Sequence, residues 1–199
     1  MSNEEKWYVL QTRTGHEDKI REICDIRLEK RGVSRIFVPK IELKRKYRGQ
    51  WQMIKRPMYP GYIFLSVFDE KNADGTGKKE GGSEAAGAVM GSKALDSLFL
   101  ELKKIPYLTR ILNADGIAVP VSEEDKSRVE SFIGEGETAE MSVGVIEGDE
   151  VKIFEGSLKD HEALIKKIDR HKRTALVETE FMGEKRLIEV GLEIILKNK

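Results

Sequence analysis

The chain has few of the residues from which catalytic and metal sites are usually built. It contains one cysteine, Cys24, and three histidines among 199 residues. A single cysteine excludes an internal disulfide framework and a thiolate metal cluster. His16 and His161 have no partner at catalytic or metal-ligating spacing, and no carboxylate pair or nucleophile–base arrangement stands out. The sequence therefore predicts no enzyme, no metal site and no cofactor.

Long hydrophobic runs are also missing. No stretch approaches the length of a membrane span, and residues 1–6 are too polar for a secretion signal. Hydrophobic residues make up 39% of the chain and charged residues 35%, as in a soluble protein with a modest core. We therefore expect a cytoplasmic protein that has no membrane partner.

The chain has no net charge, because 35 basic residues balance 35 acidic ones, but the charges are segregated. Lys40–Arg56 holds seven basic residues and one acidic residue. Glu135–Glu150 holds six acidic residues and no Lys or Arg. Lys166–Arg173 holds five basic residues against Asp169 alone. Partner hypotheses belong with such blocks rather than with the net charge.

The first part of the chain has the pattern of a small α+β domain. Trp7–Thr12 has strand composition, and a helix follows in which Thr14 and Glu17 form a capping box and Gly32 ends the last turn. Short strand segments then cover residues 36–44. This β-α-β-β order is expected for an α/β sandwich.

One stretch, Arg56–Val67, begins with a turn signal and ends in an alternating strand. Pro57, Pro60 and Gly61 form the turn. The strand that follows has aliphatic residues on one face (Ile63, Leu65 and Val67) and aromatic residues on the other (Tyr62 and Phe64). Two interpretations stay open: both faces are buried within the domain, or the aromatic face binds a partner.

The rest of the chain divides into an insertion, a helical segment, a linker and a second domain. Residues 69–93 are rich in Gly, Ala, Lys and Glu and are predicted to be a flexible insertion, and Leu95–Ile105 has a helical apolar stripe. Residues 135–144 are predicted to be the linker. Beyond residue 145, five short strands are predicted at 151–154, 163–168, 174–177, 187–190 and 193–196, with Gly191 between the last two. Such spacing is typical of a small closed barrel.

Several motifs resemble the NusG family of transcription elongation factors. In the first domain they are Trp7-Tyr8-Val9, Gly15-x-Glu17, Val38-Pro39 and Tyr59-Pro60-Gly61-Tyr62. In the second, Gly148–Val151, Glu155–Leu158 and Phe181-x-Gly183 resemble the KOW domain. The resemblance implies an α+β chain: an NGN-type α/β sandwich over residues 1–134, then a five-stranded SH3-like (KOW) β-barrel over residues 145–199.

One segment is similar to a specialised branch of that family. Ile168–Ala175 resembles the LoaP antiterminators, which act on long biosynthetic operons. Asp160–Ala163 lacks the glycine that ordinary KOW domains carry there, and Pro106-Tyr107 stands where a Pro-Gly pair is usual. Both departures argue against the housekeeping factor.

The resemblance assigns the aromatic strand a partner. In the family, this face binds the clamp helices of bacterial RNA polymerase, and the matching residues are Tyr59, Tyr62 and Phe64. An exposed aromatic strip beside Lys55 and Arg56 suits a protein partner. The alternative is that these rings pack under the helices of their own domain.

The two basic blocks are candidate nucleic-acid contacts. The residues expected to bind RNA are Lys166, Lys167, Arg170, His171, Lys172 and Arg173. The alternative is a solvated turn balanced by Glu178 and Glu180. Lys40–Arg56, with Tyr47 and Trp51 interleaved, is either a contact for upstream DNA or RNA or a solvated hairpin.

The sequence as a whole predicts a monomeric transcription antitermination factor without cofactors. Its first domain binds RNA polymerase, and its barrel binds a nascent RNA hairpin. The alternatives are a general NusG-type factor whose barrel binds proteins and a ribosome-associated KOW protein. A barrel that switches fold is a further alternative, but the Val and Ile content after Val151 favours strands.

Overall fold

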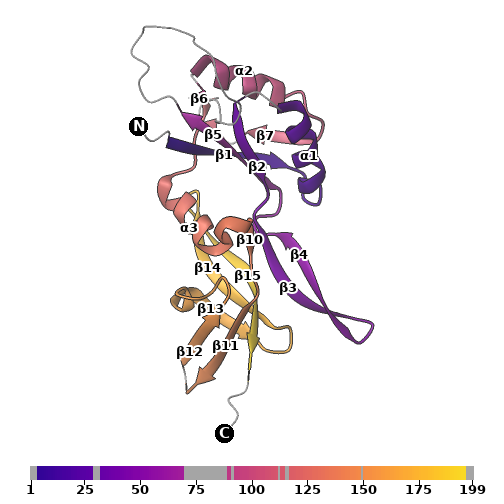
Figure 1. Ribbon diagram of the computed structural model, residues 1–199, viewed down its shortest axis with the longest axis vertical. Coiled ribbons are helices and arrows are strands. Elements are labelled where there is room, and N and C mark those ends of the chain that lie inside the picture. The colour runs from indigo at the N-terminus through magenta and orange to yellow at the C-terminus, as the bar shows by residue number, and fades with distance from the viewer. Residues whose placement is uncertain are drawn as a thin grey trace, which may run out of the picture. The chain divides into compact units, whose positions relative to one another are not determined.

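The computed structural model describes residues 4–28, 32–69, 89–90, 92–111, 113–114, 117–148 and 150–195 (Figure 1). The predicted insertion at 69–93 lies mostly outside these residues. Contacts divide the chain into two compact units. The first unit comprises Met1–Val38 and Pro60–Val121, and the second comprises Pro39–Tyr59 and Ser122–Lys199.

The first unit is built on a five-stranded sheet. Its order is β2-β5-β1-β7, with β6 pairing beside β5. The strands are β1 (Glu4–Thr12), β2 (Val33–Phe37), β5 (Tyr62–Asp69), β6 (Val89–Met90) and β7 (Leu108–Ile111). The long strands β1 and β5 run antiparallel at the centre, and Tyr8 pairs with Leu65. A two-stranded sheet of β8 (Asn113–Ala114) and β9 (Ile117–Ala118) follows.

One face of this sheet forms the hydrophobic core with two helices, α1 (Glu17–Leu28) and α2 (Ser92–Leu102). The predicted aliphatic face of β5 lies in this core. Ile63, Leu65 and Val67 are buried there beside residues of β1 and of both helices. The period-two alternation read from the sequence is therefore confirmed.

The second face of the sheet carries an aromatic cluster. Trp7, Phe37 and Phe64 are all fully buried. The Trp7 ring meets Phe37 edge-on at a centroid distance of 4.9 Å and Phe64 at 5.9 Å. The Arg35 guanidinium lies 4.3 Å from the Phe37 ring centroid. Edge-to-face packing and a cation over a ring both stabilise this cluster beyond the area that it buries.

A buried carboxylate fixes the bend that leads into β5. Glu17 is the first residue of α1 and is only 3% exposed. Its two oxygens accept hydrogen bonds from the backbone N–H groups of Gly15 and Gly61, each at 2.7 Å. The capping box predicted Glu17 to reach back along its own helix, and it does so at Gly15 rather than at Thr14. The sequence pattern does not indicate the second bond, which joins segments 44 residues apart.

The second unit begins with a hairpin of β3 (Lys40–Tyr47) and β4 (Gln50–Pro57), with β10 (Thr138–Ala139) paired parallel to β3. Helix α3 (Glu123–Ile133) and the 3-10 turn η1 (Gly134–Gly136) precede β10. A five-stranded sheet of order β12-β11-β15-β14-β13 then curls into the barrel. Its strands are β11 (Ser142–Glu147), β12 (Glu150–Glu155), β13 (Ile165–Asp169), β14 (Thr174–Phe181) and β15 (Glu184–Ile194), with the 3-10 turn η2 (Glu162–Leu164) before β13.

The barrel has five strands, as predicted, but two of the strands differ from the prediction. The predicted break at Gly191 is wrong, because β15 runs through it, pairing with β14 up to Gly191 and with β11 from Leu192 onward. Residues 135–144, predicted as a linker, contain β10 and the start of β11, where Ala139 and Ser142 are fully buried. Short strands of small residues give little sequence signal.

Among the described residues, no helix has the length and apolar character needed to cross a membrane.

We predict that Glu17→Ala lowers the free energy of unfolding by about 1–3 kcal/mol, because it leaves the buried Gly61 N–H without its acceptor. Urea unfolding measures the change. Glu22→Ala, an exposed glutamate on the same helix, is the matched control and should shift the midpoint little. Equal effects of the two substitutions would contradict the assigned role of Glu17.

Candidate nucleic-acid interface

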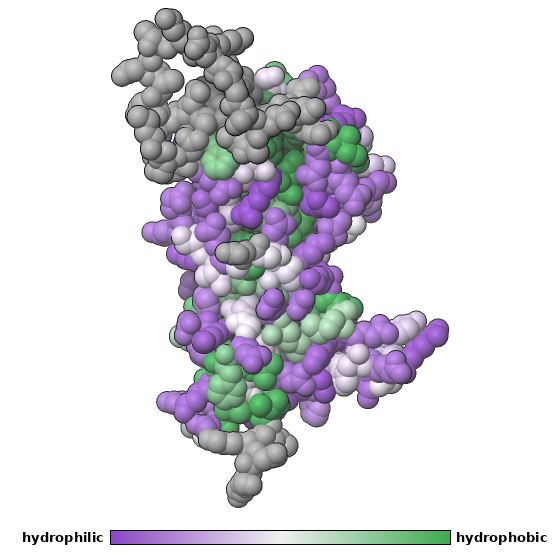
Figure 2. Space-filling view, in the orientation of Figure 1, coloured by the Kyte–Doolittle hydropathy of each residue, from purple (hydrophilic) through white to green (hydrophobic). Residues whose placement is uncertain are grey.

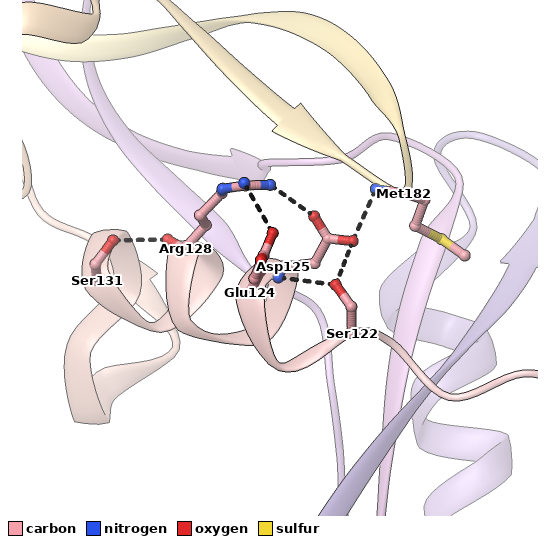
Figure 3. A network of polar contacts seen from close by, with 6 residues as sticks. All are labelled: Ser122, Glu124, Asp125, Arg128, Ser131 and Met182. Carbon is pink, nitrogen blue, oxygen red and sulfur yellow. Dashed lines mark hydrogen bonds and ion pairs between the residues drawn. The ribbon is translucent and has the colours of Figure 1, made fainter.

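Helix α3 is fastened to the barrel by a buried carboxylate (Figure 3). Ser122 caps the helix by accepting the Asp125 N–H at 3.1 Å. The Asp125 side chain accepts hydrogen bonds from the Ser122 hydroxyl at 3.0 Å, from Arg128 at 3.1 Å and from the backbone N–H of Met182 at 3.1 Å. Met182 lies in the turn between β14 and β15, so this one side chain links the helix start to the barrel.

The hairpin packs against β15 at a point where only glycine fits. A Cβ atom on Gly191 would lie 2.4 Å from the carbonyl oxygen of Glu42 in β3. The same Glu42 side chain accepts a hydrogen bond from the Met141 N–H at 3.4 Å. Two ion pairs flank this contact, Lys44 with Glu193 and Arg56 with Glu189. All four side chains are only partly exposed, so these pairs are less screened than surface pairs.

Arg173 joins the barrel turn to the hairpin. Its backbone lies in the left-handed region at φ 56°, and its carbonyl accepts the Leu192 N–H at 3.0 Å. Its guanidinium lies 2.9 Å from the Glu193 carboxylate and 4.2 Å from the centroid of the Trp51 ring. Arg173 was predicted to contact RNA; its guanidinium makes these contacts within the chain, and its predicted role stays a prediction.

The turn between β13 and β14 is held by Asp169. The Asp169 side chain accepts the backbone N–H of Lys172 at 2.9 Å. This hydrogen bond, with the nearby Lys172 and His171 charges, lowers the pKa of the Asp169 carboxyl below its usual value. The hydrogen bond to the Lys172 N–H closes the turn, and Arg170 and Lys172 therefore extend from a backbone that Asp169 holds.

The other predicted RNA contacts lie on or beside this turn and are mostly exposed. Lys167, Arg170, His171 and Lys172 all have exposed side chains. Lys166 lies at an irregularity in the β13–β14 pairing, and its ammonium is 3.4 Å from the Glu178 carboxylate. The predicted balance by Glu178 therefore applies to Lys166.

The structure brings the turn together with the first basic block, which sequence reasoning treated as a separate site. A groove of about 580 Å³ has residues of both segments in its walls. The hairpin contributes Lys44, Arg45, Lys46 and Trp51, and the barrel contributes His171 and Lys172. These segments are more than a hundred residues apart in sequence, and a spacing rule within one segment cannot indicate their proximity. The sequence signal that could have linked them is Gly191, a glycine inside an otherwise β-forming run.

The three predicted polymerase contacts occupy different environments. Tyr62 is half-buried, and Phe64 belongs to the buried aromatic cluster of the first unit. Tyr59 is 3% exposed and stacks on Phe181 of the barrel at a centroid distance of 4.5 Å. Burial raises the pKa of the Tyr59 phenol to about 12. Their predicted role stays a prediction.

Within the described residues, no group of three or more His, Cys, Asp or Glu side chains is placed to hold a metal ion. Cys24 is buried in the core of the first unit, and burial raises the pKa of its thiol to about 12. A neutral, buried thiol packs as a small apolar side chain.

Comparison with known proteins gives a consistent result. A family model described as "Transcription termination factor nusG" matches residues 5–130. The transcription termination/antitermination protein NusG of Thermus thermophilus is 21% identical over 200 residues, which span 96% of this chain and 98% of its own length. The protein of the same name from Rickettsia bellii is 23% identical over 209 residues, covering 100% of this chain and 95% of its own.

A solved structure supports the fold. The structure described as "Domain interaction in Thermotoga maritima NusG" is similar at a TM-score of 0.54 and 23% identity, covering 96% of this chain and 94% of that one. At this identity the likeness shows the fold. It confirms the predicted α+β class, with an NGN-type part and an SH3-like barrel.

We predict that Gly191→Ala separates the hairpin from β15, because the new Cβ overlaps the Glu42 carbonyl oxygen. Overpacking of this kind costs about 1–3 kcal/mol of unfolding free energy. Thermal unfolding measures the loss, and faster acrylamide quenching of Trp51 fluorescence reports the separation. Gly136→Ala is the control, because a Cβ there meets nothing within 4 Å. A Gly191→Ala protein as stable as this control would show that the close approach is unimportant.

Proposed function

Because the chain belongs to the NusG family of transcription termination and antitermination factors, we propose that it is an antitermination factor that binds both RNA polymerase and nascent RNA. Factors of this family act with RNA polymerase and are not enzymes in general. In this proposal, the first domain, residues 1–134, binds the polymerase clamp helices. The barrel, residues 145–199, binds an RNA hairpin as the RNA emerges.

The observation that carries the RNA proposal is the β13–β14 turn. Lys167, Arg170 and Lys172 are exposed, and Asp169 fixes the backbone from which Arg170 and Lys172 project. A turn that is already ordered loses little conformational entropy when its side chains bind phosphates. The segment Ile168–Ala175 is also the one that resembles LoaP antiterminators. We therefore assign to this turn the recruitment of the factor to particular transcripts.

Tyr59, Tyr62 and Phe64 are the proposed polymerase contacts. Aromatic side chains are frequent hot spots in protein interfaces. Tyr62 is the residue of the three that this structure leaves partly exposed. Contact through Tyr59 requires its stack on Phe181 to open first.

Binding two partners with one chain also explains how a modest affinity of the barrel for RNA suffices to bind the transcript. Once the first domain is on polymerase, the barrel meets nascent RNA at the high local concentration that tethering creates.

A second candidate function has its own observation. The barrel exposes large apolar side chains, including Phe154, Leu187 and Ile195, and Figure 2 shows hydrophobic residues gathered on the barrel around β11 and β12. Exposed apolar patches often mark protein interfaces. They favour the alternative in which the barrel of a general NusG-type factor binds another protein.

We predict that the full chain binds hairpin RNA with an affinity that falls steeply as salt rises, because phosphate contacts release counterions. The double substitution Arg170→Ala/Lys172→Ala should lower the slope of log affinity against log salt by about two, one for each contact. Gel shifts at several KCl concentrations measure both effects. Lys159→Ala, an exposed barrel lysine outside the turn, is the control. Binding that does not respond to salt would exclude this proposal.

We predict that Tyr62→Ala weakens binding to RNA polymerase by about 2 kcal/mol or more, roughly thirtyfold, as loss of an aromatic hot spot does. Pull-down and fluorescence titration with core polymerase measure the change, and a thermal melt checks that the domain stays folded. Tyr107→Ala removes an exposed tyrosine elsewhere in the same unit and should bind normally. Unfolding of the Tyr62→Ala protein would instead support a purely structural role.

A further inference from the structure

The groove between the hairpin and the β13–β14 turn combines basic and aromatic side chains from both segments. Hairpin residues line it together with four barrel residues, His171, Lys172, Thr174 and Glu189, of which Glu189 is paired with Arg56. Its volume of about 580 Å³ lies within the range of small-ligand sites. The groove exists because β3 lies close to Gly191, and because Lys44 and Arg173 both pair with Glu193.

Cations from both segments surround the groove. Arg45 and Lys46 are exposed on the hairpin, and Lys172 is exposed on the turn, where its ammonium is 3.7 Å from the Asp169 carboxylate. Lys44 is paired with Glu193, so its charge is largely neutralised within the chain. The three exposed cations attract a polyanion.

Aromatic rings accompany these cations. The Trp51 side chain is 38% exposed, and the Arg173 guanidinium 4.2 Å from its centroid holds the ring in place. His171 adds an exposed imidazole from the barrel side. Rings that stack on bases, beside cations that contact phosphates, are the combination that binds unpaired nucleotides.

We propose that this groove binds an unpaired nucleotide of the same RNA whose stem contacts the β13–β14 turn. The base stacks on Trp51, and Arg45, Lys46 and Lys172 contact the neighbouring phosphates. A base-paired nucleotide does not qualify, because it stays stacked in its helix and cannot reach the indole. The inference rests on the proposed function and narrows its RNA class: the hairpin carries a bulge beside the part of its stem that contacts the turn.

The test uses the full chain and two RNA hairpins at low salt. One hairpin has a bulged adenosine dinucleotide, and the other, the paired RNA, has the same stem and the same terminal loop without the bulge. Wild-type protein should bind the bulged RNA more tightly. Trp51→Ala should remove this preference and weaken binding to the bulged RNA about tenfold, as loss of one stacked base does, while binding to the paired RNA changes little. Because Trp51 is 38% exposed and a cation–ring contact such as that with Arg173 is weak at an exposed site, the substitution should lower the melting temperature only slightly.

A matched control lies on the same hairpin. Tyr47 is more exposed than Trp51 and does not line the groove, so Tyr47→Ala should bind both RNAs as the wild type does. Intrinsic fluorescence gives an independent readout. The chain has two tryptophans, and Trp7 is fully buried, so the bulged RNA should quench wild-type fluorescence but not that of Trp51→Phe.

The outcomes separate this inference from the proposed function. If no hairpin binds the wild type, RNA binding itself is wrong. If both hairpins bind through Arg170 and Lys172 but Trp51→Ala changes nothing, or weakens both equally, only the groove assignment fails. An all-DNA copy of the bulged hairpin and poly-L-glutamate are the last two ligands tested. If either quenches Trp51 fluorescence as strongly as the bulged RNA does, the groove is not specific for RNA and the inference is wrong.

Discussion

The close approach of β3 to β15 at Gly191 is the contact on which the arrangement of the second unit depends. The Glu42 carbonyl oxygen occupies the space that any larger residue would fill at Gly191. This contact brings the hairpin onto the barrel, and only then can Lys44 reach Glu193 and Trp51 reach Arg173. The groove therefore forms because Gly191 has no side chain to keep β3 away from β15.

Electrostatics explains why two basic segments can lie together. Like charges repel, and Lys40–Arg56 and Lys166–Arg173 hold twelve basic residues between them. Two carboxylates of β15, Glu189 and Glu193, lie between the segments and pair with Arg56, Lys44 and Arg173. These paired cations hold the fold together, whereas the exposed cations on either side stay available to a ligand. The basic residues of the two segments therefore divide into structural and binding members only when their ion-pair partners are known.

Much of the fold follows from local patterns, and the composite groove does not. The alternation in β5 and the helical stripe of α2 were predictable because each signal lies within one element. The boundaries of β11 and β15 were not, because short strands and a glycine inside a strand resemble turns. Long-range contacts were missed for a different reason. The hydrogen bond from Gly61 to Glu17 and the ion pair of Lys44 with Glu193 join residues 44 and 149 positions apart, and no periodicity specifies such partners.

The two proposed activities make opposite demands on the hairpin of β3 and β4. The RNA groove needs the hairpin held against the barrel, whereas a polymerase contact through Tyr59 needs its stack on Phe181 to open. Tyr59 lies at the base of that hairpin, two residues after the end of β4, so both demands act on the same element. If both proposals hold, polymerase bound through Tyr59 lowers the affinity of the groove for RNA. RNA bound in the groove lowers the affinity of polymerase for Tyr59. Thermodynamic linkage requires these two factors to be equal. A polymerase contact confined to Tyr62 and Phe64 does not open that stack, and the coupling through it disappears.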